Sequence, residues 1–286
     1  MANGNDEHRV ASGSIVRIDT ITTRGDLPIK RAEAEAELES LRTKLGELQE
    51  LLFVAGTHAV LIVLQGIDAS GKDGAVRKVF TAFNPAGCRV VSFKEPSRLE
   101  RTHDYLWRIH QQVPAKGEVV IFNRSQYEAV LVERVHRIVP SSVWRTRYDE
   151  INAFEQMLTT NGAIVIKLFL HISPEEQFQR LQDRLAEPMK WWKLQVSDWE
   201  DRARWDEYEA AYDEMLSRTS TNAAPWYVIP ADRKWVRDLL IARIVQSRLE
   251  AMSVPWRASI QEIGRRQRQS VEQFLAGRPD TFVRRI

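Results

Sequence analysis

Gln65-Gly66-Ile67-Asp68-Ala69-Ser70-Gly71-Lys72-Asp73-Gly74 is the stretch of sequence that decides the fold. An apolar run, residues 59–64, precedes it, and residues 75–83 after it have the pattern of a helix. A strand, a glycine-rich turn with a lysine and a helix, in that order, form a phosphate-binding loop. The Gly-x4-Gly-Lys spacing matches this P-loop. We therefore predict that the chain binds phosphate groups at this stretch.

The loop is expected to bind phosphate through its backbone. Successive N–H groups and the N-terminus of the following helix point at phosphate oxygens, and the glycines permit the tight path. Lys72 is expected to contact the phosphoryl group that is transferred. The phosphate-binding residues predicted in this part of the chain are Gly66, Ala69, Ser70, Gly71, Lys72, Asp73, Gly74 and Arg77.

Two acidic residues in the loop indicate a metal ion. Asp73 stands where P-loops usually have a serine or threonine, and Asp68 adds a second carboxylate. Carboxylates repel phosphate unless a cation lies between them, and Mg²⁺ commonly bridges one or two carboxylates to phosphate oxygens. We expect Asp68 and Asp73 to hold Mg²⁺, with Mn²⁺ as an alternative metal. Capping of the helix is a competing role for Asp73.

The third predicted strand ends with Asn123 and Arg124, two further candidate site residues. P-loop enzymes place a metal-binding acid at such a strand end, whereas Asn123 offers the metal only a neutral carbonyl. Glu128 is interpreted equally well as a metal ligand or as a favourable acid in the first turn of a helix. Arg124 is expected to clamp phosphate with two hydrogen bonds. Together with Asp68 and Lys72 it makes up the predicted catalytic set.

A basic segment after the fourth predicted strand has the layout of a mobile lid over about residues 184–197. Arg180 and Arg184 lie one helical turn apart, on one face of a helix. Lys190 and Lys193 follow on the connecting segment. Cations on such a lid bind a phosphate chain when the lid closes. We predict that these four basic side chains contact the phosphate chain.

The acceptor is expected near the end of the second predicted strand, the side that receives it in nucleotide kinases. Lys94 and Glu95 follow that strand directly. Asp104 and Arg108 lie one helical turn apart on the next segment. These four residues are the candidates for nucleotide contact. The acidic residues between 198 and 207 are interpreted instead as a solvated helix surface.

The predicted strands are near-continuous apolar runs separated by helices, as is typical of strands buried on both faces of a parallel sheet. We predict a three-layer α/β fold with five parallel strands, a helical lid and the P-loop at the carboxyl end of the first strand. Strands are expected at 58–65, 88–93, 118–122, 163–172 and 226–229. Helices are expected at 30–54, 75–83, 97–112, 126–138, 141–160, 174–186, 197–218 and 233–252.

The bulk composition fits one large globular domain of 286 residues. We predict an N-terminal arm (1–29), a P-loop kinase domain (30–252) and a basic C-terminal tail (253–286). A formal net charge of +2 does not exclude a strongly basic groove. Cys88 is the single cysteine, no apolar stretch approaches the length of a membrane span, and no secretory signal is visible. We therefore expect a cytoplasmic protein with no membrane or nucleic-acid partner.

The loop, the motif after the third strand and the lid together resemble the second family of polyphosphate kinases. The matching stretches are Gly66-Ile-Asp-Ala-Ser-Gly-Lys-Asp-Gly74, Phe122-Asn-Arg-Ser125 with Tyr127-Glu128, and Arg184-x3-Pro188-x-Lys190-x-Trp192-Lys193. The resemblance covers about residues 30–252. It implies a fold similar to thymidylate kinase and a homo-oligomer, either a dimer or a tetramer. It also implies Mg²⁺-dependent, reversible transfer of the terminal phosphoryl group of inorganic polyphosphate to a nucleotide.

Asn123 bears on the acceptor, because many family members have an aspartate there. The Asn-Arg-Ser-x-Tyr-Glu form resembles the branch that phosphorylates both AMP and ADP. The expected partners are therefore inorganic polyphosphate and nucleoside mono- and diphosphates, with guanine nucleotides as further candidates. Two other functions stay open. One is an ATP-dependent nucleoside monophosphate kinase, in which Asp73 would be unusual. The other is a non-catalytic regulator that binds polyphosphate or nucleotide, in which Lys72 and Arg124 would have no evident purpose.

Overall fold

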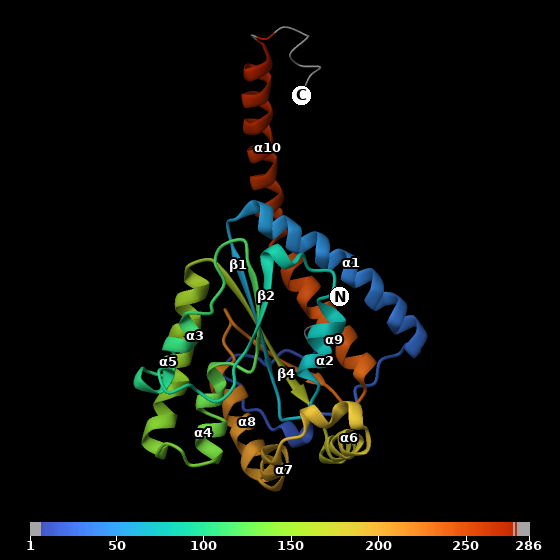
Figure 1. Cartoon of the computed structure of the whole chain (residues 1–286), viewed down its shortest axis with the longest axis vertical. Coiled ribbons are helices and arrows are strands. Elements are labelled where there is room, and N and C mark those ends of the chain that lie inside the picture. The colour runs from blue at the N-terminus through green and yellow to red at the C-terminus, as the bar shows by residue number, and fades with distance from the viewer. Residues whose placement is uncertain (1–6, 277, 279–286) are drawn as a thin grey trace.

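A sheet of five parallel strands forms the centre of the computed structural model, which describes residues 7–276 and 278 (Figure 1). The strands are β1 (Ala59–Gln65), β2 (Cys88–Ser92), β3 (Val119–Asn123), β4 (Ala163–His171) and β5 (Trp226–Pro230). They lie in the order β2-β3-β1-β4-β5. The five-stranded parallel sheet predicted from the apolar runs is confirmed. The central strand β1 is buried along its whole length, because it pairs with β3 on one side and β4 on the other.

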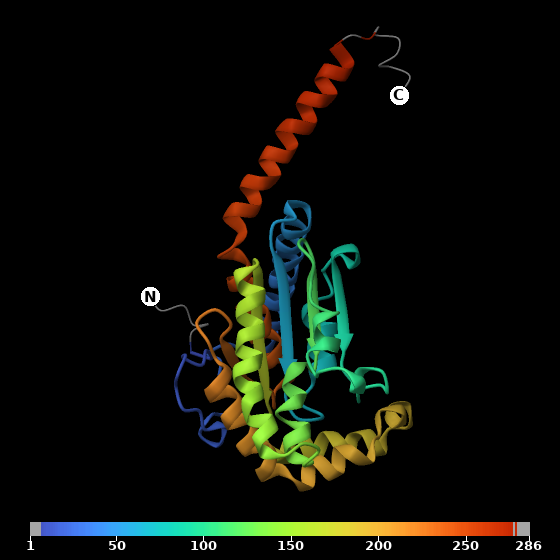
Figure 2. The same cartoon turned by 90° about the vertical axis from the view of Figure 1, so that its left-hand side faces the viewer.

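Helices cover both faces of the sheet and complete three layers, as predicted (Figures 1 and 2). On one face α1 (Arg31–Ala55), α2 (Lys72–Val79) and α9 (Lys234–Glu250) pack together. On the other face lie α4 (Val132–Val135), α5 (Ser141–Thr160) and α8 (Trp205–Thr219). The remaining α-helices are α3 (Trp107–His110), α6 (Pro174–Ala186), α7 (Val196–Ala203) and α10 (Ser253–Ala276). Among the described helices, none is both long enough and apolar enough to cross a membrane.

Short 3-10 helices connect these elements. They are η1 (Ile18–Thr20), η2 (Pro85–Gly87), η3 (Glu100–Thr102), η4 (Gln126–Ala129) and η5 (Pro188–Lys193).

The strand register brings the two motifs read from the sequence together. Leu64, next to the end of β1, lies opposite Asn123, the last residue of β3. The backbone N–H of Arg124 donates to the carbonyl oxygen of Leu64 at 3.1 Å. Because the carboxyl ends of parallel strands meet at one edge of the sheet, the loop after β1 and the turn after β3 become neighbours.

Three of the predicted helices are interrupted. The segment 97–112 contains only η3 and α3, and the segment 126–138 contains only η4 and α4. In the first, Asp104 accepts a hydrogen bond from the N–H of Leu106, a local bond that competes with helix formation. The predicted helix 197–218 is broken into α7 and α8 at Arg204, where φ is −105° and ψ is 28°.

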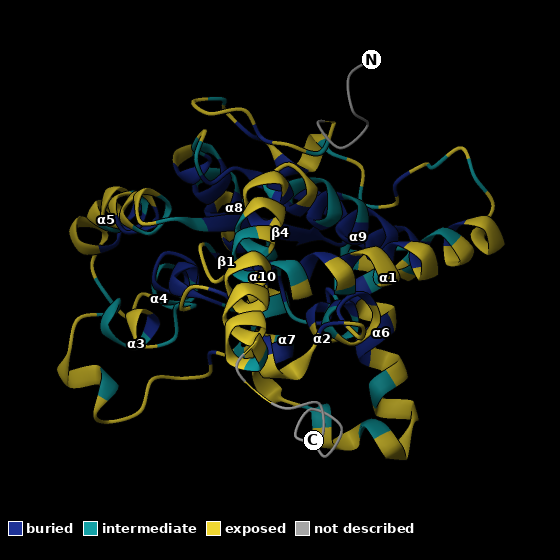
Figure 3. Ribbon diagram, turned by 90° about the horizontal axis from the view of Figure 1, so that it is seen from above, coloured by how far each residue is buried: buried dark blue, intermediate teal, exposed yellow. Residues whose placement is uncertain are grey.

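The predicted basic C-terminal tail, residues 253–286, is helical over most of its described part. Its described part begins with helix α10, which stands away from the body of the molecule and is largely exposed (Figures 1 and 3). Trp256 anchors the first turns and is fully buried. Pro255 lies in the first turn, where its missing N–H removes no helical hydrogen bond. Residues 279–286 lie outside the described part of the chain.

The N-terminal arm packs along the outer edge of β5. Arg9 forms an antiparallel bridge with Tyr227. The N–H of Val10 donates to the Trp226 carbonyl at 2.9 Å. The described part of the predicted arm contributes Val10 and Ile18 to the buried core. The arm therefore covers the edge of the last strand.

A lysine lies buried in the centre of the core. Lys167 of β4 donates from Nζ to Glu155 Oε2 at 2.7 Å, to the Tyr127 hydroxyl at 2.9 Å and to the Thr219 carbonyl at 2.6 Å. Oε1 of Glu155 accepts from the Tyr127 hydroxyl at 2.7 Å and from Gln126 Nε2 at 3.0 Å. Burial of this ion pair is tolerable because hydrogen bonds satisfy its members. The network also fixes the turn that follows β3.

Replacement of Lys167 by methionine is expected to destabilise the protein by about 3–5 kcal/mol, because the carboxylate of Glu155 would stay buried without its partner. The double variant K167M/E155L should recover most of this loss, since an apolar pair of similar volume avoids the unpaired charge. Urea unfolding followed by circular dichroism measures both. If K167M is as stable as the wild type, Lys167 is not needed to balance the buried charge of Glu155.

Candidate phosphate and nucleotide site

The loop between β1 and α2 takes a path that requires glycine at two positions. Gly66 has a φ of 146° and Gly71 has a φ of 103°, values that other residues rarely adopt. A methyl group on Gly66 would lie 2.6 Å from the carbonyl oxygen of Leu170. Ala69 also has a positive φ, of 65°, which is uncommon for a residue with a side chain. Such local strain persists at functional sites when the surrounding structure holds it.

Lys72 begins helix α2 and folds back over the loop. Its Nζ donates to the carbonyl oxygen of Gly66 at 2.6 Å and to that of Ile67 at 3.3 Å. It lies 3.9 Å from Asp68 Oδ1. Burial lowers the pKa of Lys72, and the charge of Asp68 opposes this shift. The ammonium group is therefore held inside the loop.

Asp68 forms an ion pair with Arg124. Nη2 of Arg124 donates to Asp68 Oδ1 at 2.5 Å. Burial raises the pKa of Asp68, but Lys72 and Arg124 outweigh it, and the pKa lies below its ordinary value. Arg124 itself has a φ of 64°, a left-handed conformation at the end of β3. The turn after β3 therefore places the guanidinium group of Arg124 against the carboxylate of Asp68.

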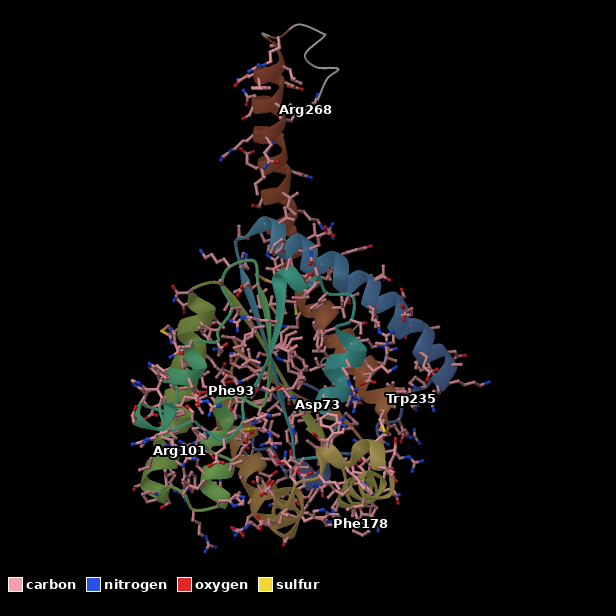
Figure 4. All side chains as sticks on the ribbon, viewed as in Figure 1. Asp73, Phe93, Arg101, Phe178, Trp235 and Arg268 are labelled. Atoms are coloured by element: carbon pink, nitrogen blue, oxygen red, sulfur yellow. The ribbon has the colours of Figure 1, made fainter. Side chains whose placement is uncertain are left out.

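Asp73 and Asn123 also meet. Asn123 Nδ2 donates to Asp73 Oδ1 at 2.6 Å. Gly71 is the residue at the N-cap of α2, and no side-chain capping bond is formed there, so the alternative role of Asp73 as a cap is not observed. Figure 4 shows Asp73 beside the lower end of the sheet, where the strands end. Asn123 presents its N–H, rather than its carbonyl oxygen, to this acid.

Glu128 lies in η4, within reach of both motifs. Its Oε1 accepts from Gln65 Nε2 at 2.8 Å, and its Oε2 lies 3.9 Å from Nη1 of Arg124. Ser125 caps η4 by accepting from the N–H of Tyr127 at 3.3 Å. Glu128 is therefore an acid in the first turn of a helix, as one of its two predicted roles requires, and it also contacts residues of the charged site.

The donor set near the loop fits a metal ion that arrives with phosphate. Among the residues that the structure describes, no three histidine, cysteine or acidic side chains are arranged to hold a metal by themselves. Asp68 and Asp73 make their described side-chain contacts through Oδ1. Mg²⁺ commonly takes one or two carboxylates and completes its shell with water and substrate phosphates. Two carboxylates at a phosphate-binding loop meet that requirement.

Arg180 was predicted to contact the phosphate chain, but the structure places it behind the loop. Its Nη1 donates to the carbonyl oxygens of Ala69 and Ser70 at 3.0 and 3.1 Å. Its Nη2 donates to those of Ala231 and Asp232 at 2.7 and 3.0 Å. The side chain is buried. The helical spacing correctly indicated a shared face with Arg184 but gave no information on what that face contacts.

Arg184 pairs with an acid that sequence reasoning assigned to a solvated surface. Its Nη1 lies 2.8 Å from Oδ2 of Asp198, which is only 5% exposed. Burial raises the pKa of Asp198, and the charge of Asp68 adds to this shift. Arg184 opposes both, and the resulting pKa is about 6. Asp198 therefore faces the phosphate-binding loop. Because it lies across the lid from Arg184, no sequence periodicity could have revealed the pair.

The two predicted lid lysines contact their own segment. Lys190 forms an ion pair with Glu187, and Nζ of Lys193 lies 4.9 Å from the ring centre of Trp192. The lid tip is open to solvent, with Met189 and Trp192 about 80% exposed. Arg77, also predicted to bind phosphate, is exposed on α2. None of these described contacts of Lys190 and Lys193 reaches the loop.

A cavity of about 440 Å³ lies next to the loop, and Arg124 and Glu128 form part of its wall. Three of the four predicted nucleotide residues, Lys94, Glu95 and Arg108, also line it. Asp104 does not appear in its lining. A volume in this range suits a small-molecule ligand.

Sequence reasoning missed two residues of this cavity, Phe93 and Arg147. The guanidinium of Arg147 lies 4.5 Å from the ring centre of Tyr105, and that of Arg108 lies 5.1 Å from the ring centre of Phe93. Phe93 directly follows β2, although the sequence pattern placed it inside the strand, and Figure 4 shows it on the same side of the view as Arg101. Arg147 comes from α5, and only the tertiary fold brings it here.

Comparisons with known proteins agree with this geometry. The family model for polyphosphate kinase 2 matches residues 28–257. An AMP/ADP-polyphosphate phosphotransferase from Meiothermus ruber is 52% identical over 227 residues, which are 79% of this chain and 85% of that protein. An ADP-polyphosphate phosphotransferase from Rhodopseudomonas palustris is 40% identical over 265 residues, 87% of this chain and 91% of that protein. The crystal structure of polyphosphate kinase 2 from Arthrobacter aurescens superposes with a TM-score of 0.83 at 40% identity, covering 89% of this chain and 92% of that one.

We expect the carboxyl group of Asp198 to titrate at a pH of about 6. Asp68→Asn should lower this pKa by removing a like charge, and Arg184→Met should raise it by removing an opposite one. Carbon-13 NMR of labelled aspartate measures both shifts. The folded protein binds the proton of Asp198 more tightly than the unfolded chain does. The contribution of this group to stability is therefore lost as the pH rises through about 6. If the pKa of Asp198 shifted in the same direction in both variants, Asp68 and Arg184 would not act on it with opposite sign.

Proposed function

The chain belongs to the polyphosphate kinase 2 family, and we propose that it transfers the terminal phosphoryl group of inorganic polyphosphate to AMP and ADP. The relative from Meiothermus ruber, which is 52% identical, is named for these two acceptors. The observation that carries the proposal is a phosphate-binding loop with two carboxylates, Asp68 and Asp73, beside a cavity that can hold the acceptor.

Arg124 has the central position in this site. It contacts Asp68 of the loop and also lines the acceptor cavity, so it lies between the two phosphate-binding regions. A guanidinium group at this point neutralises charge on the phosphoryl group as it passes from donor to acceptor. Lys72 supplies a second positive charge from inside the loop.

The acceptor cavity provides what a nucleotide requires. Arg108, Arg147 and Lys94 bring positive charge toward phosphate groups. Phe93 and Tyr105 offer apolar surface for a base. The acceptor of such a reaction is a phosphate oxygen that is already anionic, so the reaction requires no general base.

Asp68 and Asp73 are the proposed ligands of Mg²⁺, or of Mn²⁺ in its place. Once bound, the metal supplies positive charge to the phosphate oxygens. Asn123 orients Asp73 through its amide N–H, and Glu128 holds Gln65 at the start of the loop. We regard these two residues as supports of the metal site.

We further propose that the protein is a cytoplasmic homo-oligomer. Val271 and Phe274 on α10 are more than half exposed, and exposed apolar side chains on a projecting helix favour association. Cys88 is unpaired, which suits a reducing compartment. Sedimentation velocity measures the oligomeric state.

A matrix of donors and acceptors tests the proposed reaction. Polyphosphate or ATP is combined with AMP, ADP, GMP or GDP, with and without Mg²⁺, and the products are separated by anion-exchange chromatography. We expect polyphosphate-dependent formation of ADP and ATP that is lost without the metal. Asp68→Asn is the matched variant and should lower turnover by about 100-fold or more. Turnover of AMP with ATP but not with polyphosphate would instead identify an ordinary nucleoside monophosphate kinase.

The lid lysines are expected to bind the donor when the lid closes. Lys190→Ala and Lys193→Ala should each raise the KM for long polyphosphate and reduce the slope of log affinity against log salt by about one unit, because each removes one cation from a polyanion interface. Steady-state kinetics at several salt concentrations measures both effects. Lys116→Ala, which removes an exposed lysine outside the lid, serves as the control. An unchanged KM in both lid variants would remove the lid from the donor site.

A further inference from the structure

Arg237 of α9 lies directly behind the phosphate-binding loop. The side chain is buried, and its Nε and Nη2 donate to Asp238 Oδ1 at 2.8 and 2.6 Å. A methyl group on Gly71 would lie 1.9 Å from Nη1 of Arg237. The three nearest atoms to a methyl group on Gly74 are also from Arg237, the closest being Nη2 at 3.2 Å. The guanidinium group therefore fills the space behind both glycines.

Arg180 reaches the same place from α6. A methyl group on Gly71 would lie 3.5 Å from Nη1 of Arg180, the nitrogen that donates to the carbonyl oxygens of Ala69 and Ser70. Two guanidinium groups from separate helices therefore meet behind one turn of the loop. One supports the loop through hydrogen bonds, and the other supports it through close packing.

This arrangement places like charges together away from water, which is costly in free energy. Burial lowers the pKa of Arg237, Asp238 opposes the shift and Arg180 adds to it. Of the two acidic partners, Asp238 is buried, whereas Glu176, the partner of Arg180, is about one-third exposed. An apolar side chain at position 237 would fill this space at a lower cost in free energy. An anion bound on the other side of the loop would be attracted by both guanidinium groups.

We propose that Arg237 is a positioning residue for phosphoryl transfer. It holds the turn from Gly71 to Gly74 in the shape that directs its N–H groups at phosphate, and it places a fixed positive charge behind them. Its action goes through the loop backbone, unlike that of Lys72 and Arg124, which lie within the charged site. This inference rests on the proposed function, because it concerns the same phosphate-binding loop.

The decisive variant is R237M/D238N, which removes the ion pair without changing the net charge and leaves no buried acid unpaired. Arg237→Lys keeps the charge but loses the planar fork. Arg243→Met is the matched control, since Arg243 lies on the same helix and pairs with Glu37 of α1 at 2.6 Å, away from the loop. Circular dichroism and thermal unfolding establish that each variant is folded at the assay temperature.

Steady-state kinetics with polyphosphate and AMP then separates kcat from KM. We expect R237M/D238N to lower kcat by about 10-fold or more, because a misplaced loop no longer aligns the phosphoryl group. The KM for polyphosphate should also rise, Arg237→Lys should recover part of the loss, and Arg243→Met should stay within about twofold of the wild type. A folded R237M/D238N variant with the kinetic constants of the control would overturn the inference. Absence of polyphosphate turnover in the wild type would instead contradict the proposed function.

A double-mutant cycle tests the contact between Gly74 and Arg237. Gly74→Ala places a methyl group against Nη2 of Arg237, so it should lower kcat/KM in the wild type. The same substitution added to R237M/D238N should lower kcat/KM by a smaller factor than it does in the wild type, because the contact with Arg237 is already gone. If the losses multiply independently, Arg237 does not act through Gly74, and the proposed route fails.

Discussion

Positive charge lies on both sides of the loop at residues 66–74, and the site depends on how that charge is balanced. Arg124 approaches from the side of the acceptor cavity and Lys72 lies within the loop, while Arg180 and Arg237 lie behind. Each of these cations has a carboxylate or carbonyl partner within the protein, so the loop can keep its shape before any phosphate arrives. Preorganised charges of this kind need little rearrangement when phosphate charge moves from donor to acceptor.

The buried ion pair of Lys167 and Glu155 supports the site from within the core. It connects β4 and α5 to Gln126 and Tyr127, which lie only two and three residues after Arg124. The turn that presents Arg124 is therefore held by charged hydrogen bonds at the centre of the molecule. Packing alone would fix such a turn less specifically, because apolar contacts have no preferred direction.

The strands and the loop could be predicted because their signals are local. Apolar runs mark buried parallel strands, and glycine spacing marks the P-loop. Asp198 and Arg180 could not be placed, since each depends on a tertiary contact: Arg180 reaches Ala69 across 111 residues, and Asp198 meets Arg184 across the lid. Helix lengths were overestimated where a local bond, as at Asp104, competes with the helix. Helix α10 was missed because most of its surface packs against nothing in the described chain.

The N-terminal arm has a consequence for the order of folding. The arm is synthesised before the residues that it contacts. For example, the N–H of Val16 donates to Ser217 Oγ, 201 residues further along the chain. At about 5–20 residues per second, synthesis of that interval takes about 10–40 s. During this time Val10 and Ile18 lack the core in which they are later buried. In return, β5 emerges when the segment that covers its open edge already exists, so this edge has a partner within its own chain from the start.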